Sequence, residues 1–143
     1  MICLRLDKGE VDNLIELYAD NFSDGWNKAQ LQSAFDTGRF IALGVKEKGE
    51  LVGALTISLG LDDADLEGIV VKKNYLNRGV ATFLMEQMIK VVKESGINKI
   101  LLEVRKGNTP AISLYQKFNF KAIHVRKGYY ADGEDAVIMQ GDL

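Results

Sequence analysis

The stretch Leu66–Thr82, Leu-Glu-Gly-Ile-Val-Val-Lys-Lys-Asn-Tyr-Leu-Asn-Arg-Gly-Val-Ala-Thr, decides the fold. It starts with the β-branched run Ile69-Val70-Val71, which is typical of a strand. A polar turn follows, and after Gly79 the apolar residues recur at intervals of three and four, which predicts a helix. The first backbone N–H groups of such a helix have no partners within it, and the helix dipole is positive at this end. The stretch therefore predicts an anion site suited to a pyrophosphate.

Two familiar phosphate-binding loops do not fit this turn. The nucleotide P-loop ends in Gly-Lys-Ser/Thr, whereas the correctly spaced pair Gly44 and Gly49 is followed by Glu50-Leu51. No Gly-x-Gly occurs, so the dinucleotide fingerprint is missing as well. The segment Asn77–Ala81 alone leaves two interpretations open: an ordinary strand-to-helix turn, or a loop that binds phosphate through its backbone.

Composition narrows the class of protein. A chain of 143 residues, 47% hydrophobic and 27% charged, can form one globular domain, which we expect to span 1–143. The formal net charge of −2 argues against a dedicated nucleic-acid binder. Cys3 and His124 are each the only residue of their type, so we expect no internal disulfide and no His-based metal site, and a Ser-His-Asp triad is disfavoured. No apolar run reaches membrane-spanning length, which predicts a cytoplasmic protein without membrane contact.

Hydrophobic periodicity predicts an α/β (α+β) domain with a central sheet of about seven strands and about four helices. Strands are expected at 1–7, 40–45, 51–59, 61–71, 97–105, 120–125 and 136–139. Helices are expected at 10–21, 26–35, 80–95 and from 108 onward, where Asn108-Thr109-Pro110 supplies a cap and a first-turn proline.

Glu103 interrupts the apolar strand Ile100–Val104. A carboxylate in a buried strand costs several kcal/mol unless it is paired or faces a cleft. One interpretation is that Glu103 reaches solvent or pairs with Lys99, Arg105 or Lys106. The other is a general base whose pKa is raised by burial.

Tyr115 also has two interpretations. Ala111, Ile112 and Phe118 flank it at helical spacing, which is typical of a packed core aromatic. Its hydroxyl could alternatively serve as a general acid.

Several segments together resemble the RimI group of the GNAT superfamily of N-acetyltransferases. They are Leu102-Glu-Val-Arg105, Asn108–Ala111, Leu114-Tyr-Gln-Lys-Phe-Asn-Phe120, and the block from Gly128 to Met139 that contains Tyr129-Tyr130. Asn77-Arg-Gly-Val-Ala81 is similar to the acyl-CoA loop of that superfamily, with Gly79 and Ala81 at the two small positions. Leu76 departs from the usual Gln or Arg, and Asn119 stands where the group has Gly. The similarity is good from about residue 64 onward and loose before it.

The resemblance implies a GNAT fold with a mixed, mostly antiparallel sheet, and enzymes that acetylate the N-terminal alanine of a small-subunit ribosomal protein. By resemblance, Glu103 is the general base, Tyr115 the general acid, and Tyr129 and Tyr130 contact the acceptor. Acetyl-CoA would bind at Ile69, Val70, Val71, Leu76, Asn77, Arg78, Gly79, Val80, Ala81, Thr82, Asn108 and Tyr115, without a metal.

The predicted reaction is direct acetyl transfer in a ternary complex to a protein N-terminal α-amine. An α-amine has a pKa of about 8, and lysine of about 10.4, so the former loses its proton more easily. Asp62, Asp63 and Asp65 either attract a basic acceptor or form a solvated loop face. Two alternatives remain: an acetyltransferase for a small-molecule amine or a lysine, and a catalytically silent acyl-CoA-binding module. The presence of both Glu103 and Tyr115 argues against the silent module.

Overall fold

The computed structural model describes residues 1–21 and 26–143, with no description of the Asn21 side chain. The described strands are β1 (Leu4–Leu6), β2 (Phe40–Glu47), β3 (Glu50–Leu59), β4 (Ala64–Val71), β5 (Lys99–Arg105), β6 (Lys121–Arg126) and β7 (Ala136–Asp142). The helices are α1 (Val11–Asn21), α2 (Lys28–Asp36), α3 (Val80–Glu94) and α4 (Thr109–Lys117), with 3₁₀ turns η1 (Lys8–Glu10) and η2 (Lys73–Tyr75). The predicted content of strands and helices is confirmed.

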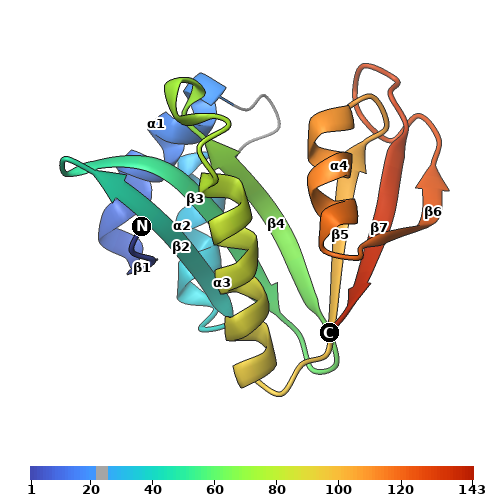
Figure 1. Cartoon of the computed structure of the whole chain (residues 1–143), viewed down its shortest axis with the longest axis horizontal. Coiled ribbons are helices and arrows are strands. Elements are labelled where there is room, and N and C mark those ends of the chain that lie inside the picture. The colour runs from blue at the N-terminus through green and yellow to red at the C-terminus, as the bar shows by residue number, and fades with distance from the viewer. Residues whose placement is uncertain (22–25) are drawn as a thin grey trace.

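The strands form one sheet in the order β1-β2-β3-β4-β5-β7-β6. All neighbouring pairs are antiparallel except β4 and β5, which are parallel. Helices α3 and α4 cover one face of the sheet, and α1 and α2 cover the other (Figure 1). Each face has its own hydrophobic core, centred on Leu84, Met85 and Met88 on the α3 side and on Leu14, Tyr18 and Leu31 on the α1 side.

Local signals explain where the helices begin and end. Asn27 and Gln30 form a capping box at the start of α2, and the Asn108 side chain accepts a hydrogen bond from the Ala111 N–H at the start of α4. Gly96 follows α3 with a φ of 80°, a conformation that glycine adopts without strain. Asn119 has a φ of 65°, which explains how Asn replaces the glycine of similar sequences.

Three predicted strands are shorter than expected, and one of them, predicted at 97–105, begins at Lys99. The strand predicted at 61–71 begins only at Ala64, because the Gly60 N–H donates to the Asp63 carbonyl (2.8 Å) and closes a turn over the intervening residues. The strand predicted at 1–7 is reduced to Leu4–Leu6, at the edge of the sheet.

The β4–β5 ladder is short, and this positions the site. Pairing covers only Ala64–Leu66 with Ile100–Leu102, although both strands continue well beyond it. On its other edge β4 stays paired with β3, but Leu66 is opposite Ile57 and Gly68 is opposite Thr56, so Glu67 is an extra residue in a β-bulge. The two strands separate beyond this point (Figure 1).

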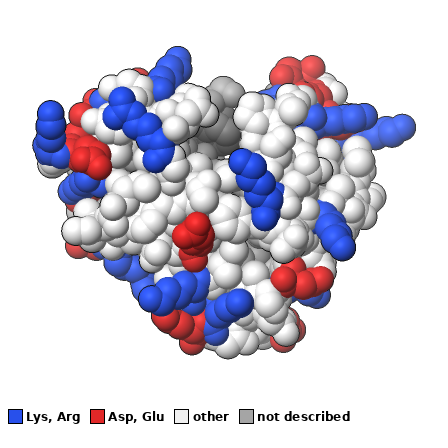
Figure 2. Space-filling model, in the orientation of Figure 1, with Lys and Arg blue, Asp and Glu red and all other residues white. Residues whose placement is uncertain are grey.

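The outer surface is of mixed charge. On the face seen in Figure 2, lysine and arginine side chains are interspersed with aspartate and glutamate. No helix among the described residues has the length and apolar character needed to cross a membrane.

Candidate active site

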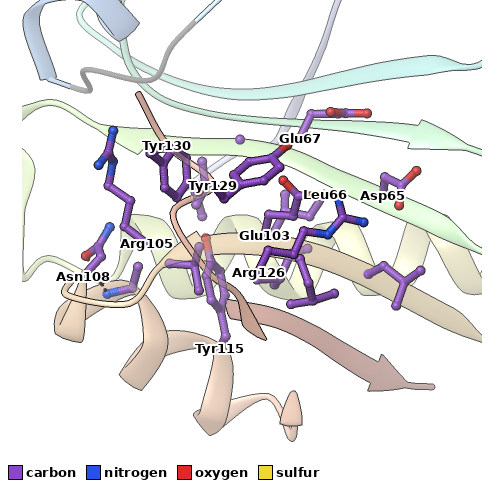
Figure 3. A pocket seen from close by; sticks show the side chains of 17 residues that line it. Asp65, Leu66, Glu67, Glu103, Arg105, Asn108, Tyr115, Arg126, Tyr129 and Tyr130 are labelled. Carbon is purple, nitrogen blue, oxygen red and sulfur yellow. Dashed lines mark hydrogen bonds and ion pairs between the residues drawn. The ribbon is translucent and has the colours of Figure 1, made fainter. Parts of the chain in front are cut away.

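A cavity of about 660 Å³ occupies the opening between β4 and β5 (Figure 3). Its lining comes from β4, β5, the first turns of α4 and the β6–β7 region: Asp65, Leu66, Glu67, Gly68, Ile69, Leu101, Leu102, Glu103, Val104, Arg105, Asn108, Ala111, Tyr115, Arg126, Tyr129, Tyr130 and Ile138. Both faces of the sheet contribute, since α4 lies on one side and the β4 bulge with the β6–β7 loop lies towards the other. Residues from both sides of the sheet thus line one cavity.

Glu103 and Tyr115 both line this cavity. Leu102 and Val104, its neighbours in β5, are buried, but Glu103 is on the alternate face, and its side chain is 38% exposed. Of the two interpretations of Glu103, the structure therefore agrees with a carboxylate that reaches solvent, here at the cavity, and not with one whose pKa is raised by full burial. The cation nearest to Glu103 is none of Lys99, Arg105 or Lys106: Arg126 Nη1 lies 3.9 Å from Glu103 Oε1. Glu103 is also the main cause that raises the pKa of Tyr129.

Tyr115 is only 6% exposed and packs against Phe120, with ring centroids 6.1 Å apart. Its hydroxyl points into the cavity (Figure 3). Burial is the largest cause that raises the pKa of Tyr115, and Tyr18 and Tyr130 add to it, so the hydroxyl keeps its proton at neutral pH. Tyr115 is thus both a packed core aromatic and a protonated donor at the cavity.

Two further carboxylates, Asp65 and Glu67, line the cavity from β4. Burial raises the pKa of Asp65, with Asp63 and Glu103 as additional causes. Burial also raises the pKa of Glu67, as do Asp65 and Glu103, while a hydrogen bond from Ser58 lowers it. Glu67 was not predicted as a site residue, although its spacing from Asp65 indicates a shared face. The bulge that aims Glu67 could not be recognised from sequence.

Gly68 allows a close contact behind the bulge. A Cβ atom at Gly68 would lie 2.7 Å from the Tyr18 hydroxyl oxygen, so no larger residue fits without displacement. The Tyr18 hydroxyl oxygen lies 3.4 Å from Thr56 Oγ1. Burial of the Tyr18 side chain raises the pKa of this hydroxyl to about 12. This buried contact packs α1 against β4 next to the bulge.

The two predicted acceptor residues, Tyr129 and Tyr130, lie at the mouth of the cavity and pack edge to face, with ring centroids 5.2 Å apart. Arg105 stacks on the Tyr130 ring at 4.1 Å, and Arg126 lies 5.6 Å from the centre of the Tyr129 ring. Sequence reasoning assigned no role at the site to Arg105 or Arg126. The position of Arg105 directly after Glu103-Val104 was the available signal.

The predicted acyl-CoA residues divide into two groups. Ile69, Asn108 and Tyr115 line the cavity, whereas Val70, Val71 and the segment Leu76–Thr82 do not. Val70 is 4% exposed and packs its side chain into the core on the α1 side, so only its backbone can face a ligand in the opening. Leu76 is 53% exposed.

The start of α3 has the geometry expected of an anion-binding turn. Asn77 and Gly79 have φ values of 61° and 81°, and the first bond within the helix runs from the Phe83 N–H to the Gly79 carbonyl (3.0 Å). The N–H groups of Val80, Ala81 and Thr82 precede that bond, as in any helix terminus. Among the described residues, no group of three or more His, Cys, Asp or Glu side chains is arranged to hold a metal ion.

Solved structures share this arrangement of elements. The crystal structure of the ribosomal-protein-S18-alanine N-acetyltransferase from Escherichia coli superposes with a TM-score of 0.91 at 26% identity, covering 99% of this chain and 92% of that one. Arabidopsis thaliana NAA60 in complex with acetyl-CoA has a TM-score of 0.87 at 17% identity, covering 99% of this chain and 98% of that one. The fold is that of N-acetyltransferases.

The sequence comparisons agree with the fold. The profile of the acetyltransferase (GNAT) family matches residues 11–120. A Bacillus subtilis protein, provisionally named a [ribosomal protein bS18]-alanine N-acetyltransferase, is 33% identical over 95% of this chain and 90% of its own length. An N-alpha-acetyltransferase of Saccharolobus solfataricus is 51% identical over 52% of this chain and 46% of its own length. The chain belongs to the GNAT family and is an acetyltransferase; enzymes of this family use acetyl-CoA.

Proposed function

We propose that this enzyme transfers the acetyl group of acetyl-CoA to the N-terminal α-amine of a protein, an alanine of a ribosomal protein in particular. The observation that carries the proposal is that Glu103 and Tyr115 reach one cavity from different elements, β5 and α4, at the point where β4 and β5 separate. Relatives named for alanine N-acetylation of ribosomal protein bS18 support the choice of acceptor. Such an acceptor would place the reaction in the cytoplasm.

In this proposal acetyl-CoA binds on the α3–α4 face. Its pyrophosphate would accept hydrogen bonds from the N–H groups of Val80, Ala81 and Thr82, beyond the turn at Gly79. The pantetheine arm would extend along the edge of β4 at Ile69–Val71, where β5 has separated, and pass Asn108. This path brings the thioester to the cavity, next to the Tyr115 hydroxyl.

The acceptor enters from the opposite face, past Tyr129 and Tyr130. The ammonium form of its terminus would be attracted by Asp65, Glu67 and Glu103, which outnumber the two arginines, Arg105 and Arg126, in the cavity lining. Glu103 takes one proton, directly or through one water molecule, and the free amine attacks the thioester carbonyl.

Collapse of the tetrahedral intermediate breaks the carbon–sulfur bond. The sulfur leaves with the bonding electron pair and takes a proton from the Tyr115 hydroxyl. The nitrogen, which became positively charged on attack, gives up its second proton through water to the Tyr115 oxygen, so that an amide forms and the tyrosine regains its proton. The raised pKa of Tyr115 keeps that proton available throughout the neutral range. The backbone N–H groups along the separated edge of β4 would stabilise the carbonyl oxygen as negative charge develops on it.

The test is mass spectrometry of matched peptides incubated with the enzyme and acetyl-CoA. One peptide has a free N-terminal alanine and no lysine, and its partner has a blocked N-terminus and one internal lysine. We expect an acetyl group on the α-amine of the first peptide and none on the second. Acetylation of the lysine peptide alone would contradict the proposed acceptor, while acetylation of neither would contradict protein N-termini as the substrate class.

A further inference from the structure

The loop between β6 and β7, residues 127–135, is attached to the end of β5 by a set of polar contacts that converge on Arg105. Arg105 Nη1 donates to both carboxylate oxygens of Asp132 (3.0 and 2.8 Å) and to Glu134 Oε1 (3.0 Å). The same guanidinium lies 4.1 Å from the centre of the Tyr130 ring. One side chain of β5 thus contacts three residues of this loop.

The turn after Arg105 adds to this attachment. The other oxygen of Glu134, Oε2, accepts from the Gly107 N–H (3.0 Å), and the Lys106 N–H donates to the Asp135 carbonyl (3.0 Å). A Cβ atom at Gly107 would lie 2.6 Å from Glu134 Oε2, so a larger residue here would displace the Glu134 carboxylate from the Gly107 N–H. The turn at Gly107 leads directly into Asn108 and α4, and therefore links the loop to the helix that carries Tyr115.

Within the loop, the contacts fix the position of Tyr130. The Tyr130 N–H donates to the Glu134 carbonyl (3.2 Å), and the Gly133 N–H donates to the Tyr130 carbonyl (2.9 Å). The Glu134 N–H donates to Asp132 Oδ1 (3.0 Å), and this bond, with the Arg105 guanidinium, lowers the pKa of Asp132. The loop is therefore a closed turn whose outer carboxylates face Arg105.

These contacts lie outside the hydrophobic cores and add little to core packing. Neither Tyr129 nor Tyr130 belongs to the core clusters of the described residues, and Tyr129 is 47% exposed. An arginine suits the position because its planar guanidinium can bridge two carboxylates and stack on an aromatic ring, which the point charge of lysine cannot do. The side chain of Arg105 is itself only 23% exposed and lines the cavity.

We propose that Arg105 is a positioning residue for the acceptor, which holds Tyr130 at the mouth of the cavity by bridging Asp132 and Glu134 while stacking on the Tyr130 ring. The inference rests on the proposed function in one respect: the acceptor amine enters past this loop. It extends that function by assigning acceptor binding to a contact between β5 and a distant loop.

The experiment compares Arg105→Lys with the wild type and with Arg5→Lys, a control on the exposed edge strand β1. For Arg105→Lys we expect the acceptor KM to rise about tenfold, a factor that corresponds to about 1.4 kcal/mol. The KM for acetyl-CoA and kcat should stay within about threefold, because Glu103 and Tyr115 keep their places. Arg5→Lys should change none of these values.

Two further measurements separate positioning from general stability. Glu134→Gln keeps an acceptor for the Gly107 N–H but removes the charge that Arg105 bridges, so it should raise the acceptor KM in the same direction by a smaller factor. Amide hydrogen exchange at 128–134 should be faster in Arg105→Lys, with an unchanged melting temperature and unchanged exchange in α3.

An unchanged acceptor KM in Arg105→Lys, or equal increases for acceptor and acetyl-CoA, would overturn the proposal. The measurement uses whichever amine the wild type acetylates. If that amine proves to be a lysine or a small molecule, the proposed acceptor is wrong, while the ratio of KM values still decides the role of Arg105.

Discussion

The proposed acetyl-CoA half and the proposed acceptor half of the substrate site are built in different ways, and only part of the first half lines the cavity. On the α3–α4 face, the proposed acetyl-CoA half is made by backbone: a turn with positive φ at Asn77 and Gly79, a helix start and a strand edge. On the opposite face, the proposed acceptor half is made by side chains from distant segments, with Arg105 of β5 contacting Tyr130, Asp132 and Glu134 of the loop.

This difference determines which substitutions each half of the substrate site can tolerate. A backbone site tolerates changes of side chain as long as the chain keeps its conformation, which is why the exposed Leu76 is compatible with the loop. A side-chain site tolerates shifts in local conformation less well, because each contact joins residues that are far apart in sequence.

The largest loss of activity is expected for substitutions of Tyr115 and Glu103, which lie where the two halves meet. Tyr115→Phe keeps the packing against Phe120 but removes the hydroxyl, and Glu103→Gln keeps the shape but removes the base. General acid and base groups each typically contribute about 100- to 10,000-fold, so steady-state kinetics should show kcat lower on that scale at unchanged acetyl-CoA affinity. Raising the pH should partly restore Glu103→Gln, because the α-amine then loses its proton unaided.

The same variants distinguish catalysis from packing. A merely structural Tyr115 would leave kcat of Tyr115→Phe within a few-fold of wild type and lower only the melting temperature. That outcome would remove the general acid from the proposed mechanism.

Gly79→Val should abolish acetyl-CoA binding. Valine is strongly disfavoured at the φ of 81° that Gly79 adopts, so the start of α3 should shift. At a ligand concentration of about 100 Kd, the wild type should gain about 2.7 kcal/mol of stability from acetyl-CoA, and this gain should vanish in the variant. The measurement is the melting temperature with and without acetyl-CoA, checked by calorimetry.

Gly79→Asn is the matched control, because asparagine tolerates the left-handed region. Retained binding in Gly79→Asn would show that backbone conformation is what the loop requires. Loss in both variants would show that the ligand approaches too closely for any side chain, and equal binding in Gly79→Val and wild type would refute the loop assignment.

Tyr130→Ala should raise the acceptor KM by about 10- to 30-fold, since it removes a rigid aromatic surface at the mouth of the cavity. The KM for acetyl-CoA should change much less. Equal increases for both substrates would assign the Tyr130 side chain to the scaffold instead of the acceptor site.

Glu67→Gln should change the melting temperature and the acceptor KM only slightly, and the change in melting temperature should depend on pH. Burial raises the pKa of Glu67 in the folded state, so the charged form destabilises the fold at neutral pH and the neutral glutamine does not. Thermal melts at pH 7 should show a rise of about 2 °C or less, which shrinks as the pH falls through the raised pKa and glutamate also becomes neutral. The acceptor KM should rise a few-fold at pH 7, and a variant less stable than wild type at pH 7 would contradict this account.

Leu76→Gln introduces the residue type that is common in similar loops. Of these substitutions, it is expected to have the smallest effect on acetyl-CoA binding. If the loop acts through backbone N–H groups, the Kd for acetyl-CoA should stay within about threefold of wild type. A tenfold gain in affinity by calorimetry would show that a side chain at this position binds the ligand directly.

The sequence by itself determined the order of the elements and the conformation of single turns. The helix after Gly79, the cap at Asn108 and the left-handed Asn119 follow from short-range preferences, because each depends on residues within one or two turns of the chain. The resemblance of the segments around Glu103, Tyr115 and Tyr129-Tyr130 pointed to acetyl transfer, which the family match confirms.

Only the tertiary structure decided how those residues meet. Pairing between β4 and β5 ends at Leu66 and Leu102, and Glu67, the extra residue of the bulge, lines the opening as a third carboxylate. The exposure of Glu103, its contacts with Arg126 and Tyr129, and the bridge from Arg105 to the loop all depend on which strands are neighbours in the sheet. Hydrophobic periodicity does not encode strand order or register directly, because these arise from contacts between residues tens of positions apart.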